Sequence, residues 1–319
     1  MTEQPRRSRH LLPVPSEPGL IETTTPDEPA DDAVAVETIG AGARYSDRWV
    51  LEDCSIRIPQ GSVVAVVGRN GAGKTTLLQM LAGLRRPDAG SVTVLGHPAW
   101  PASAGLLSRV GFVAQHKPLY RGLRVADLLK LGRRMNPSWD EPYAIDRLRD
   151  RAIPLDAKVG KLSGGQRTQV ALVMALAKRP SLLLLDEPLS DLDPLARREV
   201  MGTLMVDLAE RNVTVVLSSH SLVDLTRACD WLVLVDAGRL RLADSMDALL
   251  AGHQLLIGPI ELADRVPTRV PVVSEFRGDR QAILLVEGDD PAFRLDPRWT
   301  VRQPSVEDLV FAYMKQTTP

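Results

Sequence analysis

The sequence predicts an α/β fold, in which helices cover a central parallel sheet. From about Val36 to Ala251, short β-rich runs alternate with helix-like stretches, which is the pattern of such a sheet. Val63–Val67 is apolar on both faces, as expected of a strand in the middle of the sheet. A glycine-rich loop follows this strand, and Lys74–Leu84 then places its leucines on one helical face. Strand, glycine loop and helix form the first unit of the fold in this order.

Two more buried strands and a helical insert follow along the chain. Ser181–Leu185 and Val213–Leu217 are apolar runs that each end in polar residues. Their C-terminal ends should line the crevice where open α/β sheets bind ligands. Residues 116–160 lack strand signals, and helices are expected there over Val125–Met135 and Tyr143–Ala152. We therefore expect a small helical insert within the sheet domain.

The chain divides into three predicted parts. Residues 1–35 contain six prolines and seven acidic residues with almost no apolar periodicity, which predicts a disordered tail. Residues 36–251 form the main domain, and residues 252–319 form a small C-terminal α+β extension. In this extension, two runs after Val270 alternate like strands, and Ser305 begins a helix with a capping box.

The composition excludes several classes of protein. The 319 residues include 39 Lys and Arg against 40 Asp and Glu, so no strong net charge draws the chain to nucleic acid or anionic lipid. No apolar run approaches the roughly 18 residues that span a bilayer, and no secretory signal follows the first arginines. Cys54 and Cys229 fit neither a disulfide framework nor a zinc site. We therefore expect a cytosolic protein with a sizeable core.

The glycine-rich loop matches the phosphate-binding pattern GxxxxGK[ST], and it lies between a strand and a helix as that pattern requires. Its glycines allow backbone N–H groups to point at phosphate oxygens, and the helix N-terminus adds a positive end. Lys74 should reach the β- and γ-phosphates, and the Thr75 hydroxyl should bind Mg²⁺. The expected nucleotide-binding residues here are Gly68, Arg69, Asn70, Gly71, Ala72, Gly73, Lys74, Thr75 and Thr76.

A second motif lies at Leu162–Gln166, which reads LSGGQ. This is the signature of ATP-binding cassette (ABC) ATPases, and the sequence resembles that family from about Val36 to Ala251. The resemblance implies a P-loop NTPase core with an ABC-type antiparallel β subdomain and a helical subdomain. It also implies a head-to-tail homodimer, or a heterodimer with another ABC ATPase, that holds two ATP molecules between its subunits. Ser163, Gly164, Gly165 and Gln166 would bind the ATP held by the other subunit.

Two carboxylates end the apolar run Leu182–Leu185, and they resemble the family's Walker B strand. The resemblance implies that Asp186 holds the Mg²⁺ shell. It implies that Glu187 orients and polarises the attacking water, because phosphoryl transfer requires chiefly positioning and charge stabilisation. We therefore expect Glu187 and Lys74 to be catalytic.

Three further residues match family positions, and each has a plainer alternative. His220 corresponds to the switch histidine that contacts the γ-phosphate, although a lone histidine is often structural. Gln115 corresponds to the glutamine that touches Mg²⁺ and water, or it is a surface residue at a strand end. Tyr45 lies a suitable distance before the phosphate loop to stack on adenine, or it is an ordinary strand aromatic.

Asp191 departs from the family pattern. The segment Ser190–Asp193 resembles the loop that couples the two ATP sites across the dimer, where the family commonly has a small residue in place of Asp191. The extra charge leaves the hydrolytic residues intact; it either weakens the coupling between the sites or is solvated and has no effect.

Three features favour a transporter subunit over the alternative, a soluble ABC-type ATPase that acts on ribosomes or nucleic acid. The chain has one nucleotide-binding domain, a short helical insert and no basic tail. The resemblance then implies a separate transmembrane permease that docks on the helical insert and the Gln115 loop. The turn at Asn136–Asp140 and the stretch after Pro304 resemble export-type ATPases of ABC-2-like systems, so we expect export. Such a subunit is cytoplasmic and peripheral on the inner face of the cell membrane, which it contacts only through the permease.

Overall fold

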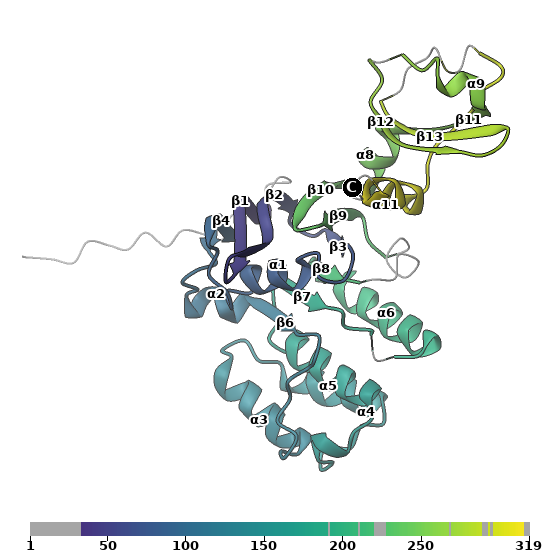
Figure 1. Ribbon diagram of the computed structural model, residues 1–319. Helices are drawn as coiled ribbons and strands as arrows, with labels where there is room; N and C mark the ends of the chain where they lie inside the picture. The colour runs from purple at the N-terminus through teal and green to yellow at the C-terminus, as the bar shows by residue number, and fades with distance from the viewer. Residues whose placement is uncertain are drawn as a thin grey trace, which may run out of the picture. The chain divides into compact units, whose positions relative to one another are not determined.

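The computed structural model describes residues 33–190, 192–209, 211–219, 228–267, 269–288, 293 and 296–315. Residues 1–32 of the predicted tail lie outside the described residues, whereas Val34 and Ala35, also assigned to the tail, begin the strand β1 (Val34–Tyr45). The described chain contains a six-stranded sheet, two four-stranded antiparallel sheets and a group of helices between β6 and β7 (Figure 1).

The six-stranded sheet has the strand order β10-β9-β3-β8-β7-β6. Strands β3, β6, β7, β8 and β9 are parallel, and β10 is antiparallel to β9. The strand bounds are β3 (Val63–Val67), β6 (Val110–Val113), β7 (Leu182–Asp186), β8 (Thr214–Ser218), β9 (Trp231–Asp236) and β10 (Arg239–Ser245). The predicted strand at Val63–Val67 is confirmed with its limits, and the other two predicted strands are each displaced by one residue.

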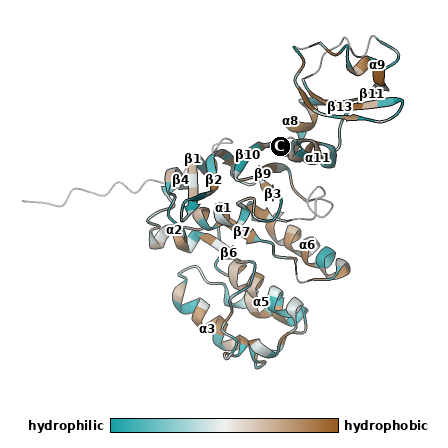
Figure 2. Ribbon diagram, in the orientation of Figure 1, coloured by the Kyte–Doolittle hydropathy of each residue, from teal (hydrophilic) through white to brown (hydrophobic). Residues whose placement is uncertain are grey.

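Helices cover this sheet because its central strands are apolar on both faces. All of β7 and β8 is buried, and Figure 2 shows the hydrophobic residues along β7. The covering helices are α1 (Lys74–Leu81), α5 (Gly164–Leu176) and α6 (Pro194–Ala209). The α/β fold class predicted from the sequence is confirmed.

An antiparallel sheet precedes the phosphate loop and resumes after α1. Its order is β2-β1-β4-β5, with bounds β1 (Val34–Tyr45), β2 (Arg48–Pro59), β4 (Ala89–Val94) and β5 (His97–Pro98). The pairing of β1 with β2 shifts register in four places. Each shift moves side chains to the other face, so the sequence shows no continuous alternation over these long strands.

The helical insert builds a small core of its own. It consists of α3 (Val125–Met135), α4 (Glu141–Asp150) and the 3₁₀ turn η1 (Val159–Lys161), and the short helix α2 (Ala104–Arg109) precedes it. Helix α3 has the limits predicted from the sequence. Its apolar residues pack with Ala144, Leu148 and Val159 and with one side of α5, so the insert rests on the helix that follows the LSGGQ motif.

The C-terminal region contains the third sheet, of order β12-β13-β11-β14. The remaining elements are α8 (Met246–Ala251), β11 (His253–Pro259), α9 (Ile260–Ala263), β12 (Val272–Arg277), β13 (Gln281–Glu287), β14 (Thr300–Arg302) and α11 (Val306–Lys315). The predicted capping box is present, because the Asp308 N–H donates to Ser305 Oγ and the Ser305 N–H donates to Asp308 Oδ2. None of the helices in the described ranges is long and apolar enough to span a bilayer.

Candidate functional site

Glycine is required at two positions of the phosphate loop, which joins β3 to α1. A Cβ atom on Gly68 would lie 2.0 Å from the carbonyl oxygen of Val235, at the end of β9. Gly73 has a φ of +109°, and a Cβ atom there would lie 2.7 Å from the carbonyl oxygen of Val50. These close approaches hold the loop against β2 and β9, and they place Lys74 at the positive N-terminus of α1.

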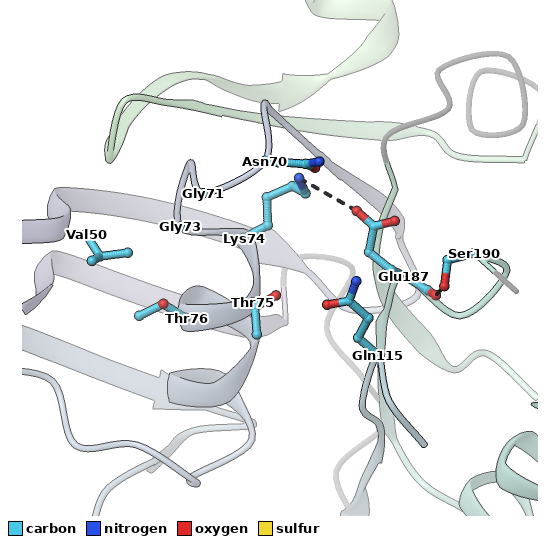
Figure 3. Close-up of a pocket in the computed structure, with 10 residues that line it drawn as sticks. All are labelled: Val50, Asn70, Gly71, Gly73, Lys74, Thr75, Thr76, Gln115, Glu187 and Ser190. Atoms are coloured by element: carbon cyan, nitrogen blue, oxygen red, sulfur yellow. Dashed lines mark hydrogen bonds and ion pairs between the residues drawn. The ribbon is translucent and has the colours of Figure 1, made fainter. Parts of the chain in front are cut away.

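The ammonium group of Lys74 is buried at the centre of this loop. It donates to the carbonyl oxygens of Gly68 at 2.8 Å and Arg69 at 3.3 Å. It also lies 3.7 Å from Glu187 Oε1 (Figure 3). The ammonium is therefore held inside the loop by groups that it can exchange for phosphate oxygens.

A cavity of about 380 Å³ opens beside Lys74, within the size range of ligand sites. Figure 3 shows Lys74, Gln115 and Glu187 directed toward one another from α1, the segment after β6 and the end of β7. The lining residues are Val50, Asn70, Gly71, Gly73, Lys74, Thr75, Thr76, Gln115, Glu187 and Ser190. The structure thus brings together residues from the phosphate loop, the Gln115 loop and the Walker B segment.

The two carboxylates at the end of β7 are both buried and face different partners. Asp186 Oδ1 accepts hydrogen bonds from Thr75 Oγ1 at 3.1 Å and from Ser218 Oγ at 2.8 Å. Glu187 has a φ of +45°, a conformation that side chains rarely adopt and that costs about 1–3 kcal/mol. This turn of the backbone directs Glu187 into the cavity, whereas Asp186 lies against Thr75.

Ser218 links these carboxylates and is a residue that the sequence reasoning missed. It is the last residue of β8, pairs with Asp186 in the parallel register and is fully buried. Its hydroxyl donates to Asp186 and accepts from the Glu187 N–H at 2.9 Å. The polar end of a buried strand beside the Walker B strand was the signal that could have identified it.

The LSGGQ residues lie outside this cavity. Ser163 caps α5, with its Oγ accepting from the Gln166 N–H at 3.1 Å, and the Gln166 side chain accepts from the Ser163 N–H at 3.0 Å. This capping box fixes the two glycines at the start of α5. The four residues are absent from the cavity wall within the described part of the chain. The signature is therefore a second polar surface at a helix N-terminus, separate from the phosphate loop.

Comparison with known proteins gives a consistent result. Residues 51–190 match the model of the family described as ABC transporter. The Nod factor export ATP-binding protein I of Rhizobium sp. (strain N33) is 35% identical over 228 residues, which are 69% of this chain and 74% of that protein. The protein of the same name from Sinorhizobium fredii (strain NBRC 101917 / NGR234) is 32% identical over 296 residues, 86% of this chain and 84% of that protein.

The chain belongs to the ABC transporter family. It is an ATP-binding and ATP-hydrolysing transporter subunit, as the sequence predicted. Among solved structures, one described as an ATP binding subunit of an ABC transporter has a TM-score of 0.61 at 26% identity and covers 67% of this chain and 91% of that chain. A bacterial Atm1-family ABC exporter with ATP bound has a TM-score of 0.60 at 27% identity, over 68% of this chain and 40% of that chain.

Several predicted site residues of this ABC subunit do not line the cavity. The Arg69 side chain contacts Asp236 and Met314 instead. Tyr45 is exposed at the end of β1, and the guanidinium carbon of Arg85 lies 4.1 Å from the centre of its ring. Stacking of Tyr45 on adenine stays a prediction. Predicted residues His220 and Asp191 lie outside the described residues.

The oxygen and amide groups beside the phosphate loop fit Mg²⁺. Thr75 Oγ1 and Asp186 Oδ1 are 3.1 Å apart, and Thr75 and Gln115 both line the cavity. Mg²⁺ is usually bound by one or two protein oxygen ligands together with phosphates and waters. The donor set therefore suits a cation that arrives with a nucleotide.

Proposed function

We propose that this chain powers export through a separate permease by closing head-to-tail with a second ABC subunit around two ATP molecules. The observation that carries the proposal is the separation of the LSGGQ surface from the phosphate-loop cavity. One chain offers each ATP only one wall, and a second subunit would supply the other. That subunit is either another copy of this chain or a related ABC ATPase.

The residues of the cavity have distinct tasks in this proposal. ATP phosphates compete for the Lys74 ammonium with the carbonyl groups of the loop and with Glu187. Glu187 is then available to orient water, while Gln115 and Thr75 face the same space. Mg²⁺, held by Thr75, Gln115 and Asp186, would offset the charge of the phosphates. His220 would contact the γ-phosphate.

A second, apolar groove supports the proposal of a permease partner. It has a volume of about 820 Å³ and lies between the sheet domain and the helical insert. Its walls include Leu84 after α1, Leu107 of α2, Met135 of α3 and Met174 of α5, and the first three are exposed. Exposed apolar side chains around a groove are typical of a surface that receives an amphipathic helix.

The groove is also connected to the ATP site. Val113 and Ala114, which line the groove, directly precede Gln115, which lines the nucleotide cavity. A helix of the permease seated in the groove would therefore move with the Gln115 loop. This connection would transmit closure around ATP to the membrane subunit, with the chain peripheral on the cytoplasmic face.

Export is favoured by the relatives that this chain resembles over most of its length. The two Nod factor export proteins are matched over 74% and 84% of their length. The molybdenum import protein ModC of Paramagnetospirillum magneticum (strain ATCC 700264 / AMB-1) is 35% identical, but over 61% of this chain and 56% of that protein. Membrane vesicles that take up substrate only with an external binding protein would contradict export.

The permease partner is tested by a single substitution in the groove. Met135→Glu places a charge among the apolar residues that would receive the helix, so the variant should separate from sedimented membranes and lose membrane-stimulated ATPase activity. Ile39→Glu is the matched control, because Ile39 is 61% exposed and Met135 is 71% exposed, and Ile39 lies on β1 outside the groove. Equal membrane binding by both variants would contradict docking in the groove. Co-sedimentation of the wild-type chain with ribosomes instead of membranes would favour the alternative function.

A further inference from the structure

The phosphate loop is bonded to the C-terminal helix through Arg69. Arg69 Nη2 donates to the carbonyl oxygen of Met314 at 3.0 Å, across 245 positions of sequence. Met314 lies in the last described turn of α11, and carbonyl groups near a helix end can accept hydrogen bonds from outside the helix. A helix C-terminus also carries partial negative charge, which a guanidinium group stabilises. The contact therefore stabilises both the Arg69 guanidinium and the C-terminal end of α11.

A buried carboxylate also lies near the same guanidinium group. Asp236, at the end of β9, is 2% exposed, and its Oδ1 lies 3.8 Å from Arg69 Nε. Its Oδ2 has no hydrogen-bond partner among the described residues. Removal of a neighbouring cation from a buried carboxylate is costly, so Asp236 restrains Arg69 in this position.

The main chain of Arg69 belongs to the ATP site. Its carbonyl oxygen accepts hydrogen bonds from the Ala72 N–H at 3.1 Å and from Lys74 Nζ at 3.3 Å. The side chain of Arg69 therefore contacts the C-terminal helix, and its carbonyl oxygen accepts a hydrogen bond from the catalytic lysine. A shift of α11 would therefore be transmitted to Lys74 through Arg69 alone.

Helix α11 is in turn fixed to the C-terminal sheet. Leu309 and Val310 are buried in a cluster with Val273 of β12 and Leu285 of β13. In the last turn, the Tyr313 hydroxyl lies 2.8 Å from Nε2 of His253, whose Nδ1 lies 2.7 Å from the Leu249 carbonyl oxygen. A ring with one proton, which Nδ1 donates to that carbonyl, accepts from Tyr313 through Nε2. The position of the end of α11 therefore depends on the position of the C-terminal sheet.

We propose that residues 252–319 act on nucleotide affinity through Arg69, as a coupling element in which α11 orders the phosphate loop. With Arg69 anchored on α11, the loop has already lost conformational freedom that nucleotide binding would otherwise remove. Nucleotide and docked α11 therefore favour each other, and the effect is reciprocal. Arg69 is a positioning residue in this scheme. The inference depends on nucleotide binding alone, and it is independent of the permease and of the direction of transport.

Hydrogen exchange on the full chain, with and without saturating ADP, tests the coupling at a site remote from the nucleotide. In the wild type, ADP should slow exchange of the amides in the last two turns of α11 by about five- to tenfold. Arg69→Ala should bind a fluorescent ADP derivative about five- to twentyfold more weakly and should lose the ADP-dependent protection of α11 at saturation. Arg57→Ala is the matched control. The Arg57 side chain is 70% exposed, and its nitrogen lies 3.9 Å from the carboxylate oxygen of Glu37, with which it forms an ion pair.

A second variant approaches the same coupling from the C-terminal side. Tyr313→Phe removes the hydrogen bond to His253 without altering the phosphate loop, and it should weaken ADP binding by about two- to fivefold. If Arg69→Ala does not fold, this variant alone decides. Unchanged ADP affinity in Tyr313→Phe would overturn the proposal, as would protection of α11 in Arg69→Ala equal to that of the wild type, or wild-type α11 exchange that ADP leaves unaltered.

Discussion

Ser218 offers a sharp test of how the fold positions the hydrolytic residues. Its hydroxyl donates to Asp186 Oδ1 at 2.8 Å and accepts from the Glu187 N–H at 2.9 Å. Ser218→Ala removes both hydrogen bonds from a fully buried position. Asp186 would keep the Thr75 hydroxyl as a donor, and the Glu187 N–H would lose its serine acceptor.

The magnitude follows from these two bonds. A hydrogen bond to a charged group contributes about 1.5–3 kcal/mol, and a buried N–H left without its acceptor costs about 1–3 kcal/mol. We expect Ser218→Ala to lower the free energy of unfolding by about 3 kcal/mol, or the Tm by about 6–12 °C for a domain of this size. Because the hydroxyl holds the Asp186 carboxylate and the main chain of Glu187 in place, kcat for ATP hydrolysis should also fall, by about 10–100-fold.

The control lies at the other end of the same strand. Thr214 is 1% exposed, and its hydroxyl accepts from the Gly61 N–H at 2.9 Å, remote from the nucleotide cavity. Thr214→Ala should therefore lower the Tm but leave kcat near the wild-type value. Thermal unfolding and steady-state ATP hydrolysis are measured for both variants well below their melting temperatures. Wild-type turnover in Ser218→Ala would refute the positioning role, whatever its effect on the Tm.

The other predictions concern Glu187 and Lys74, the phosphate loop at Gly68, and the two cysteine thiols. Glu187→Gln should retain ATP binding and reduce turnover by about 10²–10⁴-fold, and size-exclusion chromatography should show an accumulated ATP-trapped dimer. Lys74→Ala should instead weaken ATP binding itself. Gly68→Ala places a Cβ atom 2.0 Å from a carbonyl oxygen of β9, so calorimetry should show a loss of about 1–3 kcal/mol of stability together with weaker ATP binding. Burial raises the pKa of Cys54 and of Cys229 from 9.0 to about 12, so the unfolded chain releases these protons first and stability should fall as the pH rises from about 9 toward 12. Denaturant unfolding at several pH values should show a shallower decline when both cysteines are replaced by alanine.

The parts of the fold that the sequence predicted are those with an uninterrupted local signal. Val63–Val67 is apolar throughout because β3 has parallel neighbours on both edges and is covered on both faces. By contrast, β1 and β2 shift register four times, and residues such as Gly40 adopt a positive φ there. Their alternation is broken by the bulges themselves, so only the family resemblance indicated an antiparallel sheet.

The residues of the site also divide into those that the sequence predicted and those that it did not, and the reason is chemical. Lys74 and Thr75 were predictable because phosphate binding demands particular groups at particular spacings, whereas Glu187 was indicated by the resemblance to the ABC family. Ser218 belongs to no such pattern. Its role follows from the register that places it beside Asp186, and a parallel register is set by the whole sheet.

Arg69 extends this reasoning to the positions that a motif leaves open. In GxxxxGK[ST], the glycines and the lysine serve phosphate binding, whereas the pattern leaves the second position open to any residue. At that position this chain carries a guanidinium that reaches Asp236 and the end of α11. Because phosphate chemistry does not constrain it, such a position can carry a contact particular to one protein without loss of the ATP site. An unconstrained position of the loop is therefore where a C-terminal region can gain control over nucleotide binding.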